Sequence, residues 1–381
     1  MFRLSEDNVA IRDMALAFSA EKLSPHAVEW DEKKHFPVDV MREAATLGMG
    51  GIYVKDDVGG SGLTRLDSAV IFEALSQGCP AVAAYISIHN MCAWMIDTYG
   101  NDTQRKKWLP ALVTMDKCAS YCLTEPGAGS DAAALSTRAT RDGDFYVLNG
   151  QKQFISGAGN ADDFYVVMAR SGGDGPKGIS TFVVEGGTPG LTFGANERKM
   201  GWNAQPTRAV MFDNCRIPAE NLIGKEGDGF KIAMSGLDGG RLNIAACSVG
   251  GAQAALDKAL AYTNERKAFG KKLNEFQALQ FRLADLAIEL EAARLFLYAA
   301  AAAYDRGDAD KTKRIAMAKR FVTDTGFEVA NGALQLLGGY GYLSEYGMEK
   351  IVRDLRVHQI LEGTNEIMRL IVARALLAEQ N

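Results

Sequence analysis

The amino-acid sequence predicts a mainly helical α+β protein in which a strand region separates two helical regions. Ala- and Leu-rich segments with helical spacing precede about residue 118, short β-branched and aromatic runs fill residues 119–224, and long helical patterns return from about 225. Few folds place strands between two helical units, so this order limits the possible fold families. A chain of 381 residues can also bury a large core and enclose a ligand between domains.

Residues 1–118 are expected to form an N-terminal helical domain. Its helical segments read MREAATLG, LDSAVIFEALSQ and HNMCAWMIDTYG. A glycine loop containing Gly59, Gly60 and Gly62 interrupts them. We therefore expect a first unit of packed helices.

Residues 119–224 are expected to form a middle domain of strands. The runs FYVLNG, FYVVMAR, STFVVEG and TRAVMF are short and rich in β-branched and aromatic residues. Turn pairs such as Asp142-Gly143 and Asn149-Gly150 separate them. This pattern predicts a small sheet or barrel.

Residues 225–381 are expected to form a C-terminal helical bundle domain. In one helix the apolar residues alternate in steps of four and three: Leu279, Leu283, Leu286, Leu290, Ala293 and Leu297. Such a seam predicts close antiparallel helix packing. A further helix is predicted from about 312 to 337, ending at Gly338-Gly339, and a last one from about 365 to 378 with Thr364 as its cap.

Composition excludes several classes of partner. The net charge is −5 and there is no basic run, so a nucleic-acid partner is not expected. No stretch of about 18 apolar residues lacks a charge or a glycine cluster, so we expect no membrane span. Acidic Glu6, Asp7 and Asp13 do not fit a secretory signal or a transit peptide. The expected location is the cytoplasm, or the mitochondrial matrix if a transit peptide has been removed.

The cysteines and histidines do not indicate a metal site or a hydrolase. The six cysteines show no CxxC pair or metal-ligand spacing and are expected to be buried thiols in a reducing compartment. The four histidines are scattered, without an HExxH motif or a convincing nucleophile relay. His358 is the only one near a candidate site, and a structural role is favoured for it.

Two glycine-containing segments could bind a ligand. YCLTEPGAGSD, from Tyr121 to Asp131, offers backbone N–H groups and the Ser130 hydroxyl to a polar or anionic ligand, but an ordinary turn explains the same residues. QLLGGYGY, starting at Gln335, could let a pyrophosphate approach its glycines, or it could simply end a helix. It follows a helix and lacks the GxGxxG order, so NAD binding is not expected.

Charged residues stand out at three positions. Glu362 lies between apolar Leu361 and Gly363, and apolar surroundings raise the pKa of a carboxyl group, as a general base on a weak acid requires. A glutamate in a surface loop is the alternative. Arg374 interrupts an apolar helical stripe and either reaches water or holds a phosphate. Arg266 lies at a helix end, where a solvated cation paired with the helix dipole is also common.

These segments together resemble the acyl-CoA dehydrogenase family. TEPGAGSD, RKAFG, QLLGGYGY and ILEGTNEIMR occur in that family in this order and at this spacing, and the resemblance covers nearly the whole chain. It implies an N-terminal helical domain, a middle β-barrel and a C-terminal four-helix bundle. It also implies one FAD per subunit and a homotetramer.

The resemblance assigns site residues motif by motif. It implies that Glu362 is the catalytic base. It implies FAD contacts from Tyr121, Cys122, Leu123, Thr124, Gly129, Ser130, Phe154, Ile155, Ser156, Thr364, Asn365 and Glu366. Further FAD contacts, some of them across a subunit interface, are implied for Arg266, Phe269, Phe276, Gln277, Gln335, Leu336, Leu337, Gly338 and Gly339. The acyl-CoA substrate is expected to contact Ser130, Asp238, Gly239, Gly240, Arg241, Gly363 and Arg374.

The resemblance also implies a mechanism. Glu362 is expected to take the α-proton of a short acyl thioester while FAD receives the β-hydride, giving an α,β-enoyl-CoA. The backbone N–H of Glu362 and a ribityl hydroxyl of FAD would polarise the thioester carbonyl. Electron-transferring flavoprotein would then reoxidise the flavin.

Within the family, FISGAG, MGWNAQPTRAV, GLDGGR and VHQILEGTNEIMR resemble the branch that oxidises isobutyryl-CoA in valine catabolism. The isovaleryl-type enzymes carry their base where this chain has Gly240, which cannot act as one. Nitroalkane oxidases have an aspartate in place of Glu362. Ser156-Gly157 departs from the Thr-Asn of many members but agrees with the isobutyryl branch. Butyryl-CoA and 2-methylbutyryl-CoA stay open as substrates, and an acyl-CoA oxidase or an inactive binding protein is a weaker alternative.

Overall fold

The structure, a computed structural model, describes residues 3–160 and 162–379 and confirms the predicted order of helices, strands and helices. Ser5, Thr64 and Asn101 each cap the start of a helix by accepting a hydrogen bond from the backbone N–H three residues on. The first helical part contains α1 (Glu6–Phe18), α2 (Ala27–Lys33), α3 (Val38–Thr46), α4 (Arg65–Gly78), α5 (Pro80–Tyr99) and α6 (Asp102–Val113).

Helix α5 joins this part to the rest of the molecule. It is apolar around most of its circumference, and most of its side chains are buried. It packs against α4, against the long helix α7 (Gly229–Glu265) and against strand β1 (Ala119–Cys122). One apolar helix therefore lies between both helical parts and the strands.

The strands form one sheet of mixed direction. The path of hydrogen-bonded neighbours runs β6-β7-β3-β2-β4-β5-β8, and β1 pairs in parallel with β4. The described strands after β1 are β2 (Arg138–Asp142), β3 (Phe145–Ser156), β4 (Phe164–Arg170), β5 (Ile179–Glu185), β6 (Leu191–Phe193), β7 (Thr207–Pro218) and β8 (Leu222–Ile223).

Strand β4 is buried on both faces, which explains its continuous apolar sequence. Phe164, Val166 and Met168 pack into a core shared with α5 and α7. Alternate residues such as Tyr165 and Val167 face an interior shared with β3, β5 and β7. The strands thus surround a core of their own, as expected for a barrel, although the pairing path of the described strands has β6 and β8 as its two ends.

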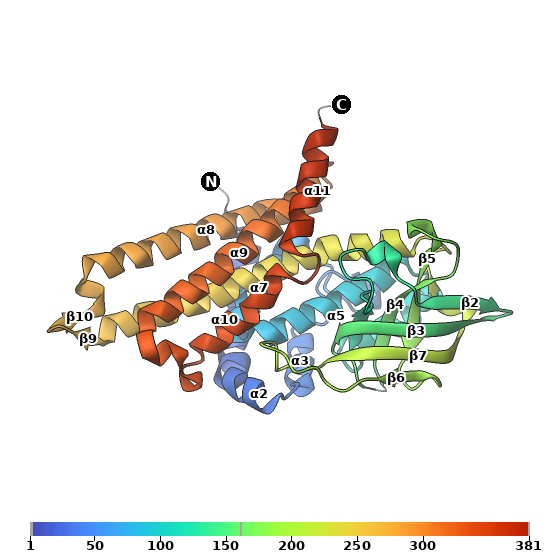
Figure 1. Ribbon diagram of the computed structural model, residues 1–381, viewed down its shortest axis with the longest axis horizontal. Helices are drawn as coiled ribbons and strands as arrows, with labels where there is room; N and C mark the ends of the chain where they lie inside the picture. The colour runs from blue at the N-terminus through green and yellow to red at the C-terminus, as the bar shows by residue number, and fades with distance from the viewer. Residues whose placement is uncertain (1–2, 161, 380–381) are drawn as a thin grey trace.

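The long C-terminal helices α7, α8 (Gln277–Asp305) and α9 (Lys311–Leu337) lie side by side (Figure 1). A small hairpin of β9 (Lys267–Ala268) and β10 (Lys271–Lys272) turns the chain from α7 to α8. The helices that follow α9 are α10 (Met348–Arg356) and α11 (Asn365–Ala378). In Figure 1 α11 projects away from the bundle, and the sheet lies at one end of the molecule.

The predicted helix seam and helix ends are confirmed. Leu286, Leu290, Ala293 and Leu297 are buried, whereas Ile288 on the other face of α8 is exposed. Helices α9 and α11 agree with the predicted spans to within one residue, and the Thr364 side chain accepts a hydrogen bond from the Ile367 N–H. The domain boundaries at about 118 and 224 lie in the segments before β1 and α7, and they remain a proposal.

Disulfides, membrane spans and metal sites were not expected from the sequence. All six cysteines are buried and free, as predicted. Within residues 3–160 and 162–379, the helices are too short or too polar to cross a membrane. The same residues contain no cluster of His, Cys, Asp and Glu that could hold a metal ion.

Candidate active site

Glu362 lies in the segment that connects α10 to α11, where the backbone is strained. Glu362 has φ +54° and Gly363 has φ +89°, so two consecutive residues are left-handed. This conformation costs a non-glycine residue roughly 1–2 kcal/mol. Arg241 Nε on α7 donates to the carbonyl oxygen of Glu362 at 3.1 Å, and Lys319 Nζ on α9 donates to that of Gly363 at 2.9 Å. Tertiary contacts therefore help to hold the backbone from which the Glu362 side chain projects.

The carboxyl group of Glu362 points at Gly240 of α7. Its Oε2 is buried and has no hydrogen-bond partner among the described residues. A Cβ on Gly240 would lie 2.3 Å from that oxygen and 3.0 Å from Met91 Sδ. Burial raises the pKa of Glu362 to about 7, although the positive charges of Arg241 and Lys319 act in the opposite direction. A carboxyl group with this pKa can accept a proton at neutral pH.

One turn of α7 places most of the predicted substrate-binding residues beside Glu362. Arg241 Nη1 donates to Asp238 Oδ1 at 2.8 Å, and the other oxygen of Asp238 accepts from Thr312 Oγ1 at 2.8 Å. The intervening glycines, Gly239 and Gly240, leave room for side chains from other elements. Arg374 does not join this group, because it is exposed further along α11.

The predicted flavin loop begins in β1 and continues to Ser130. Tyr121 hydrogen-bonds the carbonyl oxygen of Ala233 on α7 at 3.3 Å, and the charge of Glu362 contributes to its raised pKa after burial, so this end of the loop is near the base. Thr124 is half-buried, and Gly129 and Ser130 are exposed. Cys122 and Leu123 are buried in two different cores, so their contact with a ligand would come from the backbone.

A buried ion pair holds this loop in place. Glu125 accepts hydrogen bonds from Lys152 Nζ at 2.7 Å and from the backbone N–H groups of Ser136 and Thr137 at 2.6 and 2.9 Å. Burial raises the pKa of Glu125, but Lys152 and these donors outweigh it and lower the pKa to about 2. The glutamate of the TEPGAGSD segment therefore has a structural role that the sequence did not reveal.

Lys152→Met is expected to lower the free energy of unfolding by roughly 3–5 kcal/mol, because Glu125 is then buried without its cation. Urea denaturation measures this change. Adding Glu125→Gln to the same chain should restore part of the loss, since no charge remains buried. An unchanged unfolding midpoint in Lys152→Met would show that the pair does not stabilise the loop.

Phe154 is a predicted flavin contact whose backbone conformation is unusual. It is left-handed, with φ +59°, in an irregular part of β3, and its side chain is 64% exposed. A single chain thus presents a flat aromatic surface to whatever lies beside β3. The Ile155 side chain is buried in the core of the strand region, so a contact with a ligand would come from its backbone. The carbonyl oxygen of Ser156 accepts a hydrogen bond from Ser120 Oγ at 2.9 Å.

The three residues after Gly363 start α11. Thr364 caps the helix, and Glu366 is exposed in the first turn. The Asn365 side chain is 3% exposed and bonds Lys319 Nζ at 2.9 Å and Asp324 at 2.6 Å, so it fastens α11 to α9. A cofactor could reach Asn365 through its backbone only.

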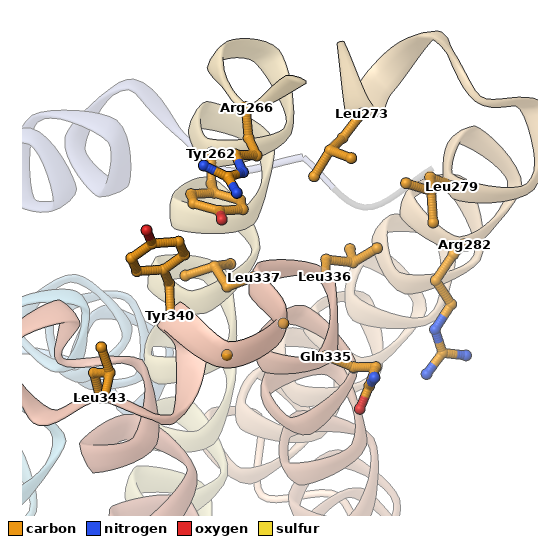
Figure 2. Close-up of a pocket in the computed structure, with 13 residues that line it drawn as sticks. Tyr262, Arg266, Leu273, Leu279, Arg282, Gln335, Leu336, Leu337, Tyr340 and Leu343 are labelled. Carbon is orange, nitrogen blue, oxygen red and sulfur yellow. The ribbon is translucent and has the colours of Figure 1, made fainter. Parts of the chain in front are cut away.

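A second group of predicted cofactor residues lines a groove of about 850 Å³. It lies where α7 and α9 end and α8 begins, and Figure 2 shows Arg266, Tyr262 and Tyr340 on one side with Gln335 and Arg282 on the other. Leu336, Leu337, Gly338 and Gly339 complete the α9 end of the groove. Nearby on the α7–α8 connection, Phe269 is 96% exposed, its ring centroid is 6.3 Å from that of half-buried Phe276, and Gln277 is exposed.

The two groups are far apart in one chain. Arg241 and Arg266 are 25 residues apart along α7, which corresponds to about 37 Å at 1.5 Å per residue. The structure therefore brings Glu362 together with Asp238–Arg241 and Tyr121, and it brings Arg266 together with Gln335–Gly339. It does not bring these two sets together.

Comparison with known proteins identifies the family of this chain. Family models described as the N-terminal, middle and C-terminal domains of acyl-CoA dehydrogenase match residues 5–116, 120–215 and 227–377. The chain belongs to the acyl-CoA dehydrogenase family.

Individual members are similar over almost their full length. Mitochondrial isobutyryl-CoA dehydrogenase of Dictyostelium discoideum is 57% identical, covering 98% of this chain and 90% of the relative. The structure of butyryl-CoA dehydrogenase from Megasphaera elsdenii has a TM-score of 0.95 and 39% identity, covering 99% of this chain and 100% of the other. The structure described as PigA with FAD and proline has a TM-score of 0.95 and 31% identity, covering 99% of each chain.

In this acyl-CoA dehydrogenase, two buried cations near the site were missed by sequence reasoning. Lys319 interrupts an apolar stripe of α9, the signal that drew attention to Arg374, so the sequence could have indicated it. Arg65 is 4% exposed, and its guanidinium stacks 3.6 Å from the Tyr53 ring, where it needs the space left by Gly239. No sequence signal joins Arg65 to Gly239, because they are 174 positions apart.

Proposed function

We propose that this acyl-CoA dehydrogenase oxidises a short branched acyl-CoA, isobutyryl-CoA, to methacrylyl-CoA. The observation that carries the proposal is the Oε2 atom of Glu362, which is buried and unpartnered opposite Gly240. The 57% identity to an isobutyryl-CoA dehydrogenase supports the substrate, and valine catabolism is the corresponding context. Butyryl-CoA and 2-methylbutyryl-CoA are the alternatives.

FAD fits the residues of this chain. A Cβ at Gly127, Gly129, Gly338 or Gly339 would meet no atom within 4 Å, so these backbones are open to a ligand. Exposed Phe154 offers an aromatic surface to a flavin ring, and Arg266 offers a cation to a phosphate. When bound, FAD supplies an acceptor for the β-hydride of the substrate. The FAD-bound neighbour of 31% identity supports the same cofactor.

The chain's own residues supply the proton acceptor and its setting. Glu362 takes the α-proton, and its apolar burial keeps the carboxylate weakly solvated and therefore basic. Gly240 leaves the space in which this carboxylate turns toward the substrate. The backbone N–H of Glu362 is proposed to donate to the thioester carbonyl, an interaction worth about 3 kcal/mol in comparable sites.

We assign the CoA part of the substrate to Ser130, Asp238 and Gly363, with exposed Arg374 free to meet a phosphate. Arg241 already binds Asp238 and the carbonyl oxygen of Glu362, so its proposed task is to hold the base beside the thioester. This division explains why one arginine is buried and the other is exposed.

The distance along α7 supports a multimeric enzyme. Residues near Glu362 and residues near Arg266 are about 37 Å apart in one chain, further than one FAD can reach. A second copy that placed its Arg266 groove beside the first copy's flavin site would complete the binding site. We therefore propose that each FAD contacts two subunits. The family resemblance implies that these subunits belong to a homotetramer and that electron-transferring flavoprotein is the electron acceptor.

We infer the mitochondrial matrix as the location. The relative from Dictyostelium discoideum is named as a mitochondrial protein, which favours the matrix over the cytoplasm. Both locations remain predictions for this chain.

Anaerobic addition of acyl-CoA to the purified protein tests the function. Bleaching of the flavin absorption that is fastest with isobutyryl-CoA would support reaction and substrate together. Faster bleaching by butyryl-CoA or isovaleryl-CoA would keep the reaction and change the substrate. A bound flavin that none of the three reduces would overturn the proposal, and rapid peroxide formation in air would identify an oxidase instead.

The pH dependence of kcat/KM is expected to follow Glu362. Because the carboxylate is the active form and its pKa is about 7, kcat/KM should rise roughly tenfold per pH unit below pH 7 and level off above it. Initial rates at fixed ionic strength measure this profile, with flavin retention at each pH as the control. A profile that stays flat through neutral pH would contradict the assignment.

A further inference from the structure

Lys319 is a buried lysine that contacts the backbone carrying the base. Its side chain is 0% exposed on α9. Nζ donates to the carbonyl oxygen of Gly363 and to Oδ1 of Asn365, both at 2.9 Å. Gly363 follows Glu362 directly and Asn365 is three residues after it, so Lys319 holds the chain just C-terminal to Glu362, next to the Glu362 carbonyl oxygen that Arg241 holds.

We infer that Lys319 is a positioning residue for Glu362, holding its backbone through Gly363 and Asn365 and stabilising its carboxylate through charge. This inference rests on the proposed role of Glu362 as the base. It extends that role by naming a side chain that holds the segment carrying the base and adds positive charge near it.

The hydrogen bonds of Lys319 do not by themselves require its positive charge. Its hydrogen-bond acceptors are a peptide carbonyl and a side-chain amide, which a neutral donor could satisfy equally well. Burial disfavours an ammonium and lowers the pKa of Lys319 to about 8, while the negative charge of Glu362 raises it. The charge of Lys319 therefore acts beyond these two hydrogen bonds, and Glu362 is the acidic group that raises its pKa most.

Lys319 is one of two cations that lower the pKa of Glu362, and Arg241 has the larger effect. Arg241 from α7 is the other cation that lowers the pKa of Glu362, but its Nη1 already pairs with Asp238 at 2.8 Å. The remaining titratable groups coupled to Glu362 are uncharged near neutral pH: Tyr53, Tyr121 and Cys247. Besides Glu362, the groups coupled to Lys319 are Arg241, Asp324, Glu366 and His358.

Titration of the Glu362 carboxyl group tests the inference without substrate. Protein labelled with ¹³C-glutamate is titrated in the infrared, and the Glu362 band is assigned by subtracting the spectrum of Glu362→Gln. Lys319→Met and Lys319→Gln should each raise the pKa of Glu362 by about one unit, because both remove the charge. Lys319→Arg keeps the charge and should return the pKa toward that of the wild type.

Activity distinguishes the two contributions of Lys319. The acid limb of the kcat/KM profile should move upward by about one pH unit in both neutral variants, giving roughly tenfold lower rates below pH 7. At high pH the rate should come closer to that of the wild type in Lys319→Gln, which keeps a hydrogen-bond donor, than in Lys319→Met. Lys313→Met is the matched control, because Lys313 also joins α9 to α11, through Glu379, but does not touch the base segment.

An unchanged Glu362 titration in Lys319→Gln and Lys319→Met would overturn the inference, whether or not activity falls. If neither variant folds, the reciprocal measurement applies: the pKa of Lys319 in Glu362→Gln, followed by NMR of labelled lysine, should fall below that of the wild type. An identical Lys319 pKa in both proteins would also overturn it. Because both titrations are made without acyl-CoA, their failure is distinguishable from failure of the proposed reaction.

Discussion

Glu362→Gln is expected to lower kcat for acyl-CoA oxidation by roughly 10²–10⁴-fold, the usual effect of losing a general base. The amide has nearly the same shape as the carboxyl group and fits the space beside Gly240, but it cannot accept the α-proton. Flavin should remain bound, because Glu362 is not a predicted FAD contact. Stopped-flow measurement of flavin bleaching under anaerobic conditions gives the rate directly.

The same variant is expected to be more stable than the wild type at pH 8. The pKa of Glu362 in the folded chain is about 7, above the ordinary carboxyl value, so the folded state binds the proton more tightly than the unfolded chain. Ionised Glu362 therefore destabilises the fold increasingly as pH rises from the unfolded pKa to about 7. Thermal melting at pH 5 and pH 8 should show the gain of Glu362→Gln at the higher pH.

Glu328→Gln serves as the control, since Glu328 is exposed on α9 and makes none of the contacts described for the site. It should change neither the rate nor the melting temperature. A Glu362→Gln enzyme with normal turnover would refute the assigned base and with it the proposed mechanism.

Gly240→Ala is expected to lower kcat by about 100-fold, because it displaces the base without removing it. The new Cβ would lie 2.3 Å from Glu362 Oε2 and 3.0 Å from its Cδ, so the carboxyl group must move. The Glu362 backbone has little freedom to follow, since Arg241 holds the carbonyl oxygen of Glu362 and Lys319 holds that of Gly363. Steady-state kinetics with isobutyryl-CoA should show the loss mainly in kcat.

Gly251→Ala in the same helix is the matched control. It makes the same change in helix propensity, but its Cβ would meet the flexible end of Leu355 at 2.8 Å and the ring of Pro80 at 3.2 Å, not the base. Its activity should stay near that of the wild type even if its stability changes. Equal activity in the two alanine variants would show that the space at Gly240 is not needed for catalysis.

Local sequence patterns predicted the elements of this protein well. The leucine seam of α8, the Thr364 cap and the end of α9 at Gly338 follow from side-chain periodicity and from the conformations that threonine and glycine favour. Such features depend on residues within a few positions of one another. They can be read without knowing what the element packs against.

The residues next to Glu362 in the sequence were not enough to identify it as the base. The residues next to it left a surface glutamate as an alternative, and only the family resemblance assigned Glu362 as the base. The structure shows the reason for its altered acidity: a buried Oε2 facing Gly240, which is 122 positions away in the chain. Burial is a property of packed elements, and no local pattern specifies it.

The sequence by itself determined the order of the elements, the family and the candidate base, because these depend on residue spacing and on motifs. Only the tertiary structure decided which charges meet at Glu362, that Glu125 is a buried partner of Lys152, and that the residues beside Glu362 lie about 37 Å along α7 from Arg266 and its groove. Contacts between distant segments arise when helices and strands bury their apolar faces together. Side chains such as Lys319 acquire their role from that packing.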